Sequence, residues 1–241
     1  RTTCLVLAAF VLIPAVAYSI PNGFTSAKAA SSYEPVGVGK KLVDCFPGED
    51  RLFAKYVYEK VLGKSDWDSK CGEYQLADND VQAIQNCTKI DMTQSVFAKD
   101  KQKCSDVTGI QNFTNLTYLD LSHNKITFLP ELPAGLTFLN VRYNQLTSLP
   151  ELPAGLTTLC ARHNKLTSVP ELPAGLLRLN LGENQLKSLP KLPEGLIYLN
   201  IKDNYLDSFP EFPAGLDILD ISGNPAPRPQ LLPIGLTVYQ F

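Results

Sequence analysis

The C-terminal half of the chain is repetitive and contains three residues with the chemistry for catalysis or metal binding. Cys160 lies three residues before His163, and His123 occupies the same position as His163 two repeats earlier. A thiol beside an imidazole can act as a nucleophile with its base. Two imidazoles can also hold a metal ion together.

The spacing of these residues argues against both kinds of chemistry. On an extended strand, residues three apart point to opposite faces, so His163 should point away from Cys160. Residues two strands apart in a sheet are separated by about 10 Å, which is too far for His123 and His163 to share a metal ion. We therefore expect Cys160 to be an ordinary free thiol, and we expect no catalytic residue, metal or cofactor.

A short acidic segment, Asp78-Asn79-Asp80, has the residue types that bind calcium. The glycine and the other ligands of an EF-hand loop do not follow it in the sequence. The cysteines likewise lack the paired spacing and the nearby histidine of a zinc site. We interpret the acidic segment as a loop or a helix cap.

Side chains suited to protein recognition recur at the strand positions of the repeat. Leucines should point to one face of each strand and the residues between them to the other, so equivalent residues form columns across neighbouring strands. Aromatic and arginine side chains are the usual energetic anchors of protein interfaces. The alternative is that these residues only fit an exposed pleated surface. The candidate partner-binding residues are Tyr118, His123, Phe138, Arg142, Tyr143, Arg162, His163, Arg178, Glu183, Tyr198, Lys202 and Asp203.

These columns depend on a twenty-residue repeat that runs from Leu116 to Leu236. Its frame, L-x-x-L-x-L/V/I-x-x-N-x-L, places apolar residues at alternate positions of a short strand. The leucines leave water only when the next turn of the chain stacks about 4.8 Å away. The amide of the asparagine can bond to backbone groups that the bend after the strand leaves unpaired. It recurs as Asn124, Asn144, Asn164, Asn184, Asn204 and Asn224.

The second half of the repeat reads Leu-Pro-Glu-Leu-Pro-Ala-Gly, as in residues 149–155. Proline at this density excludes a helix and favours extended or polyproline II backbone. The glycine before the first leucine of each strand suggests a positive φ angle or tight packing. It recurs as Gly135, Gly155, Gly175, Gly195, Gly215 and Gly235.

Over residues 116–241, about half of the chain, the frame resembles the leucine-rich repeat. The L-P-x-L-P-x-x-L-x-x-L signature resembles the short twenty-residue class that is typical of bacterial effector proteins. The resemblance implies an α/β solenoid: a leucine-rich repeat arc with a parallel β-sheet on the concave face, an extended or polyproline II convex side and a small helical N-terminal cap. The candidate residues would then line the concave face and bind a protein or peptide. In some members the repeats select substrates for a separate ubiquitin ligase domain.

The N-terminal residues resemble a secretory signal. Arg1 precedes an apolar run from Cys4 to Ala17, which ends in the small residues Ala15 and Ala17. The run is shorter than the roughly 20 apolar residues that cross a bilayer, and its pattern fits a cleavable signal peptide. Residues 1–17 are therefore predicted to be a signal peptide of a secreted or cell-surface protein; the alternative is a buried helix of a cytosolic protein. Residues 18–44 are predicted to be a flexible lead-in.

Residues 45–115 are predicted to form a helical cap ahead of the repeats. A stack of repeats exposes its leucine core and an open strand edge at its first turn, which some other segment must cover. A second helix is expected near residues 80–86, followed by a degenerate strand over residues 88–92. The alternative, a catalytic domain, has no histidine in this segment. The first helix is expected from the helical spacing of Phe53, Tyr56, Val57 and Val61, ahead of Gly63.

Cysteines and sequons in the predicted cap agree with an extracellular location. Two disulfides are expected there, and the four cysteines allow three pairings. The disulfide candidates are Cys45, Cys71, Cys87 and Cys104. In a eukaryotic host the sequons would make Asn86, Asn112 and Asn115 glycosylation candidates.

The composition narrows the class of partner. The formal net charge is -2, which argues against a general nucleic-acid binder. We predict a secreted, non-enzymatic module that binds a protein or peptide. The main alternative is the recognition portion of a larger protein, such as a receptor kinase ectodomain or an effector ubiquitin ligase, with its catalytic domain beyond Phe241. A structural or adhesion protein is a third possibility. The last strand, near Val238 to Phe241, either closes the coil or marks a truncation.

Overall fold

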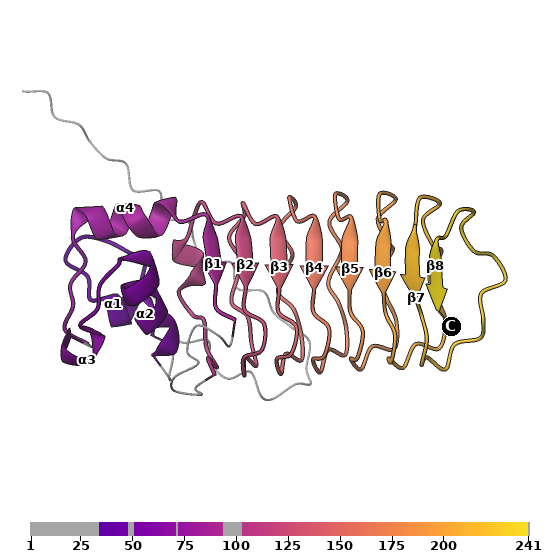
Figure 1. Cartoon of the computed structure of the whole chain (residues 1–241), viewed down its shortest axis with the longest axis horizontal. Coiled ribbons are helices and arrows are strands. Elements are labelled where there is room, and N and C mark those ends of the chain that lie inside the picture. Colours follow the sequence, from indigo (N-terminus) through magenta and orange to yellow (C-terminus); the bar gives the residue numbers. More distant parts are fainter. Residues whose placement is uncertain (1–33, 48–50, 71, 94–102, 241) are drawn as a thin grey trace, which may run out of the picture. The chain divides into compact units, whose positions relative to one another are not determined.

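The computed structural model describes residues 34–47, 51–70, 72–93 and 103–240 (Figure 1). Its repeats form one sheet of eight parallel strands in sequence order. Residues twenty apart lie opposite each other on neighbouring strands, as Leu139 does with Leu159. The predicted α/β solenoid is confirmed, including a first strand ahead of the regular repeats. The strands are β1 (Lys89–Asp91), β2 (Tyr118–Asp120), β3 (Phe138–Asn140), β4 (Thr158–Cys160), β5 (Arg178–Asn180), β6 (Tyr198–Asn200), β7 (Ile218–Asp220) and β8 (Val238–Gln240).

The core lies on the leucine face of the sheet. The central residue of each strand from β2 to β7 is a leucine that is at most 1% exposed. A second apolar residue follows each strand from β2 to β7, as Val141 follows β3, and is at most 1% exposed. Burying one such side chain contributes about 1.5 to 3 kcal/mol, so the stacked rows of leucines are the main source of stability. The segments that return from one strand to the next contain no helix within residues 121–237, as the prolines predict.

The asparagine of each repeat connects two turns of the coil. The side-chain Nδ2 of Asn184 donates to the carbonyl of Leu181 in its own repeat at 2.9 Å and to that of Ala161 in the previous repeat at 3.0 Å. Its Oδ1 accepts the N–H of Leu166 at 3.0 Å. Asn144, Asn164 and Asn204 make the same contacts. The predicted pairing of the asparagine amide with backbone groups is therefore confirmed.

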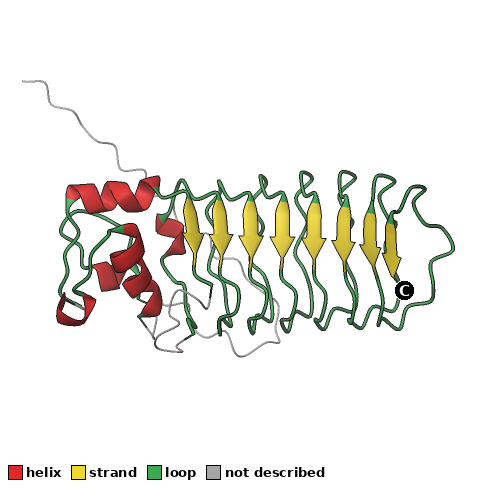
Figure 2. Cartoon of the chain, in the orientation of Figure 1, coloured by secondary structure: helices red, strands yellow, loops and turns green. Residues whose placement is uncertain are grey.

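The segment ahead of the repeats is helical (Figure 2). The expected helix that contains Phe53 and Val61 is present, and it ends before Gly63, whose φ is 66°. Its second half has π-helical geometry. The expected second helix is present as well. The helices are α1 (Leu42–Cys45), α2 (Leu52–Tyr56), the π-helix η1 (Val57–Val61), α3 (Trp67–Lys70), α4 (Asp78–Asn86) and the 3₁₀-helix η3 (Ile110–Asn112).

The helical segment contacts the outer edge of β1. Its centre is a group of three aromatic rings, Phe46, Phe53 and Phe113, with centroids 5.4 to 6.1 Å apart. The hydroxyl of Tyr56 accepts the backbone N–H of Asp91 in β1 at 3.1 Å. An edge strand exposes unpaired backbone groups. The Tyr56 hydroxyl pairs one such group of β1, as a segment that caps the repeats must do.

The glycine prediction, a positive φ angle or tight packing, is met at Gly235 and is wrong at Gly175 and Gly215. At Gly135, Gly155 and Gly195 an added Cβ would lie 3.4 to 3.9 Å from its nearest neighbour, which is an ordinary contact. Among these glycines only Gly235 has a positive φ, of 107°, and the strand-entry glycines Gly175 and Gly215 have open space where a Cβ would lie. The entry to each strand is a turn closed by ordinary backbone bonds, such as the N–H of Leu176 to the carbonyl of Pro173 at 3.0 Å. This turn keeps negative φ angles, so it does not require glycine.

The cysteine and sequon predictions also need correction. Cys45 and Cys87 are free thiols, in contrast to the two disulfides expected. Each thiol instead contacts a nearby carbonyl, Cys45 that of Pro35 and Cys87 that of Lys89. Asn112 is buried because its side chain bonds within the protein, so it is a poor glycosylation candidate.

Several predictions fall on residues that the structure does not describe. The predicted signal peptide and residues 18–33 of the lead-in lie outside the described residues, as does Cys71. The exposed asparagines Asn86 and Asn115 keep their sequons as predictions. Among the described residues, none of the helices has the length and apolar character to cross a membrane.

Candidate functional site

The bend after each strand has left-handed backbone. The residue before each of the first five repeat asparagines has a positive φ, between 50° and 62°, although none of the five is glycine; before Asn224 the position is Gly223, with a φ of 69°. This conformation costs an ordinary residue about 1 to 2 kcal/mol. It is held because the backbone pairing of the strands continues into the bend, as in the bond from the N–H of His163 to the carbonyl of Gly182 at 2.9 Å. These residues are His123, Tyr143, His163, Glu183 and Asp203.

Three rings at this bend form a stack across neighbouring repeats. The Tyr143 ring lies between His123 and His163, with centroid distances of 4.5 and 4.6 Å. Burial, with a smaller contribution from Arg142, lowers the pKa of His123, which favours its neutral form. The tyrosine ring separates the two imidazoles, in agreement with the spacing predicted from the sequence. Within the described residues, no group of three His, Cys, Asp or Glu side chains is arranged to hold a metal ion.

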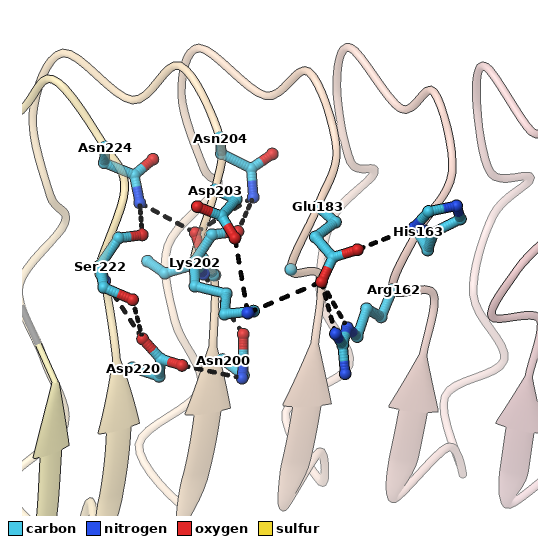
Figure 3. A network of polar contacts seen from close by, with 12 residues as sticks. Arg162, His163, Glu183, Asn200, Lys202, Asp203, Asn204, Asp220, Ser222 and Asn224 are labelled. Carbon is cyan, nitrogen blue, oxygen red and sulfur yellow. Dashed lines mark hydrogen bonds and ion pairs between the residues drawn. The ribbon is translucent and has the colours of Figure 1, made fainter.

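Glu183 is the centre of a charged network (Figure 3). Its carboxylate accepts from Nδ1 of His163 at 2.8 Å and from Nε of Arg162 at 3.0 Å, and Nζ of Lys202 lies 3.6 Å away. Lys202 also reaches the Asp203 carboxylate at 3.5 Å. The bonds from His163 and Arg162 lower the pKa of Glu183 to about 2. The charges of Arg162 and Lys202 are thus largely compensated within the protein.

The first residues of β1 to β3, and those of β5 and β6, form two further stacks on the face opposite the leucines. The rings of Tyr118 and Phe138 are parallel, with centroids 4.3 Å apart, and Nζ of Lys89 lies 4.6 Å from the centroid of Tyr118. Further along the sheet, the guanidinium of Arg178 lies over the ring of Tyr198 at 4.7 Å. Cation–π contacts of this kind contribute about 0.5 to 1 kcal/mol at exposed sites.

The third residues of strands β2 to β7, apart from Cys160 in β4, form a polar row that is not among the candidate residues expected from the sequence. Asn140 donates to the Asp120 carboxylate at 2.8 Å, and Asn200 donates to that of Asp220 at 3.3 Å. The Asp120 carboxylate also accepts the N–H of Ser122 at 2.9 Å, and Asp120 is only 8% exposed. In the sequence, an Asp or Asn two residues before each bend could have indicated these bonds from the side chain to the backbone. Their role is structural, because the side chains are used within the protein.

Arg142 differs from the other cations of this face. Its side chain is exposed, and among the described residues it has neither an ion-pair partner nor a cation–π contact, whereas Arg178 lies over the ring of Tyr198. Phe138 precedes it by four residues on the same face, and Tyr143 follows it. A guanidinium without an internal partner can bind a carboxylate with two parallel hydrogen bonds.

Cys160 and His163 do not form a nucleophile pair. His163 bonds to Glu183 and stacks on Tyr143, while Cys160 lies half-buried at the end of β4. Burial raises the pKa of the Cys160 thiol, which keeps the thiol protonated and a poor nucleophile. The structure therefore brings the twelve predicted residues together as stacks and ion pairs, with Arg142 as the exception.

Comparison with known proteins identifies the repeats. Residues 114–154 match the family described as Leucine Rich repeats (2 copies). YopM from Yersinia enterocolitica WA-314 is similar in structure, with 28% identity over 77% of this chain and 41% of that chain and a TM-score of 0.57. YopM of Yersinia pestis, a leucine-rich effector protein, has 32% identity over 58% of this chain and a TM-score of 0.51. This chain covers 46% of the Yersinia pestis protein. No curated protein matches in sequence.

Proposed function

We propose that this leucine-rich repeat protein is a non-enzymatic recognition module that binds a protein or peptide on the polar face of its sheet. One observation carries the proposal: the leucine position of the strand is the same in every repeat from β2 to β7, while the first position of the strand varies. Core packing fixes the leucine position but not the first position of the strand, so the variation there is available for recognition. The varying residues are Tyr118, Phe138, Thr158, Arg178, Tyr198 and Ile218.

The contacts on this face suit tight binding. Stacks and ion pairs already fix the rings and charges, so a partner would immobilise few side chains, and the entropic cost of binding is small. Aromatic and arginine side chains are typical anchors of protein interfaces. Since Glu183 already binds Arg162 and Lys202, the exposed guanidinium of Arg142 is the group that favours a carboxylate on the partner.

Charge reversal on the face tests this proposal. Peptides selected from a displayed library against the purified chain would be measured with Arg142→Glu, alone and combined with Arg162→Glu. We expect at least tenfold weaker binding, because the mutation replaces an attraction with a repulsion. Lys187→Glu is the matched control, since Lys187 is exposed in the loop after Asn184.

The melting temperature is expected to change little in the Arg142 variant, because surface substitutions usually alter stability by less than about 0.5 kcal/mol. If the selected peptides bind the Arg142→Glu and Lys187→Glu variants with the same affinity as the original chain, the polar face is not the binding surface.

We also propose that the Cys160 thiol is not a catalytic nucleophile. Its support is the raised pKa of the thiol and the engagement of His163 with Glu183. Iodoacetamide should label Cys160 slowly at neutral pH. Fast labelling with a pH midpoint well below that of a free thiol would indicate an activated nucleophile instead.

We also propose that the protein is secreted. The support is the charged start and apolar run of residues 1–17. Expression of the full chain with a C-terminal tag, followed by N-terminal sequencing of the exported product, tests this. A product that begins after residue 17 is expected, and retention of the uncleaved chain inside the cell would contradict it.

A second candidate function is the recognition portion of a larger protein with a receptor kinase or ubiquitin ligase domain. It is favoured by the length of the similar structures, of which this chain covers 41% and 46%. The gene sequence after the codon for Phe241 separates the two candidates. A stop codon there supports the module, and a further reading frame that encodes a domain supports the larger protein.

A further inference from the structure

Strand β4 interrupts the column of stacked side chains. On one side, Lys89, Tyr118 and Phe138 follow each other with distances of 4.6 and 4.3 Å. On the other side, Arg178 covers Tyr198 at 4.7 Å. The residue in register between Phe138 and Arg178 is Thr158, whose side chain is too short to continue the stack.

The gap has the width of one flat group. Neighbouring strands lie about 4.8 Å apart, so the planes of Phe138 and Arg178 are separated by two spacings, or about 9.6 Å. Stacked rings prefer centroid distances above about 4.5 Å. A single ring inserted above Thr158 would therefore contact Phe138 on one face and Arg178 on the other, at the spacing already present elsewhere in the column.

The polar row is interrupted on the same strand. Cys160 lies in register between Asn140 and Asn180, where the other strands from β2 to β7 carry an amide or a carboxylate. Both outward side chains of β4 are thus small, and both are only partly exposed. Both columns are therefore interrupted on β4, which lies between β3 and β5 in Figure 1, and we call the space above its two small side chains the β4 notch.

We propose that this β4 notch, formed by Phe138, Thr158, Cys160 and Arg178, binds one aromatic side chain of the partner. The proposal rests on the polar face being the recognition surface. Phe138 offers a ring for stacking, and Arg178 offers a cation to the electron-rich face of the inserted ring. An aliphatic side chain would lose the cation–π contact, and the guanidinium of Arg178 would repel a second cation. The notch therefore selects Phe, Tyr or Trp.

Small probes test the notch without a known partner. The probes are N-acetyl-phenylalanine amide, its cyclohexylalanine analogue of similar size, and N-acetyl-arginine amide, each titrated at millimolar concentration into the isotope-labelled full chain. In amide NMR spectra, the phenylalanine probe should shift the resonances of residues 138, 158 and 178. The cyclohexyl and arginine probes should bind at least several-fold more weakly, since neither gains the cation–π contact.

Two variants locate the binding of the phenylalanine probe. Thr158→Phe fills the notch with a ring of the chain itself and should abolish the shifts. Lys187→Phe is the control, because it adds the same ring at an exposed position in the loop after Asn184, away from the polar face, and should leave binding unchanged. Arg178→Met keeps an unbranched stem, removes the charge and should weaken binding about two- to fivefold. Arg178→Met therefore still tests the notch if Thr158→Phe folds poorly.

Equal binding of the phenylalanine and cyclohexylalanine probes would overturn the proposal, as would unchanged binding to Thr158→Phe. The selected peptides separate this failure from failure of the proposed function. If they lose affinity in Arg142→Glu but not in Thr158→Phe, the face binds its partner and the notch does not contribute. If the phenylalanine probe binds the notch but the affinity of the peptides is the same for Arg142→Glu as for the original chain, the notch binds an aromatic group and the polar face is not the recognition surface.

Discussion

The repeats and the helical segment before them satisfy their buried polar groups in different ways. In the repeats, one contact pattern recurs from turn to turn, as with Asn184 and its bonds to Ala161 and Leu181. In the helical segment each contact occurs once and joins distant residues: Asn112 donates to the carbonyl of Cys45 at 3.2 Å and accepts the N–H of Val36 at 2.9 Å. A repeated contact can be read from the sequence as a period, whereas a single contact cannot.

The largest expected difference between the two regions concerns two glycines with positive φ. Gly109, in the helical segment, has a φ of 100°, and an added Cβ would collide with the carbonyl oxygen of Cys45 and lie 2.6 Å from the Phe46 ring. Gly109→Ala should therefore lower the free energy of unfolding by at least about 3 kcal/mol, since strain and overpacking add. Urea unfolding measures this loss.

Gly223 is the matched position in the repeats. Its φ is 69°, and its equivalents in the earlier repeats are all larger residues. An added Cβ would meet the exposed side chain of Asp203, which can turn away, and would lie 3.2 Å from the Cα of Asp203. Gly223→Ala should cost about 1 to 2 kcal/mol. Equal losses for the two glycines would contradict the distinction between single and repeated contacts.

The next largest effect is expected in the asparagine row. Asn184→Ala leaves the N–H of Leu166 without its partner, while the carbonyls of Ala161 and Leu181 each lose one of the two asparagine amides that bond to them. A buried group left unpaired costs about 1 to 3 kcal/mol, so we expect a loss of about 1 to 3 kcal/mol in urea unfolding. Gln185→Ala, at the exposed neighbouring position, should change stability by less than about 0.5 kcal/mol. Similar losses in both variants would show that the asparagine bonds contribute little.

A smaller effect tests the junction between the two regions. Tyr56→Phe removes the hydroxyl that accepts the N–H of Asp91 in β1. One hydrogen bond contributes about 0.5 to 1.5 kcal/mol, so the loss should be about 1 kcal/mol. Tyr205→Phe, at an exposed ring in the repeats, is the control and should have no measurable effect. If Tyr56→Phe is equally silent, this bond does not hold the helical segment on β1.

The smallest effect depends on pH. Bonds from His163 and Arg162 lower the pKa of Glu183 from 4.5 to about 2 in the folded protein. The ionised carboxylate therefore stabilises the fold above pH 4.5, and this contribution disappears as the pH falls towards 2. The pair is partly exposed, so its size should be at most about 1 kcal/mol.

The thermal stability of the original chain and of Glu183→Gln should therefore differ by a constant amount above pH 5. The two curves should converge between pH 4.5 and pH 2. A difference that persists at pH 2, or that grows on acidification, would contradict the role of the Glu183 carboxylate.

The sequence predicted the repeated features because each one was visible several times. Alternation around Leu139 predicts the strand, and the period of Asn144 and Asn184 predicts the bonds between turns. The helix that contains Phe53 follows from apolar spacing in the same way. Cys45 and Cys87 are free thiols, although the sequence led us to expect disulfides. That prediction relied on residue type alone. No repeated pattern constrained their partners.

The features that the sequence did not predict arise from contacts between turns. Positive φ was expected at glycines but occurs at residues such as His163 and Glu183, because continued backbone pairing imposes it on any side chain. Glu183 was recognised as a face residue, but its central position among Arg162, His163 and Lys202 depends on how long side chains reach across strands. The notch at Thr158 likewise becomes visible only when neighbouring rings and their spacing are known.

The most direct test of the central claim is photo-cross-linking of a selected peptide. Benzoylphenylalanine would replace Tyr198, which lies on the polar face under Arg178, or Lys187, which lies in the loop after the strand. We predict that the peptide cross-links from position 198 and not from position 187. Cross-linking from position 187 alone would place the partner off the polar face and contradict the account.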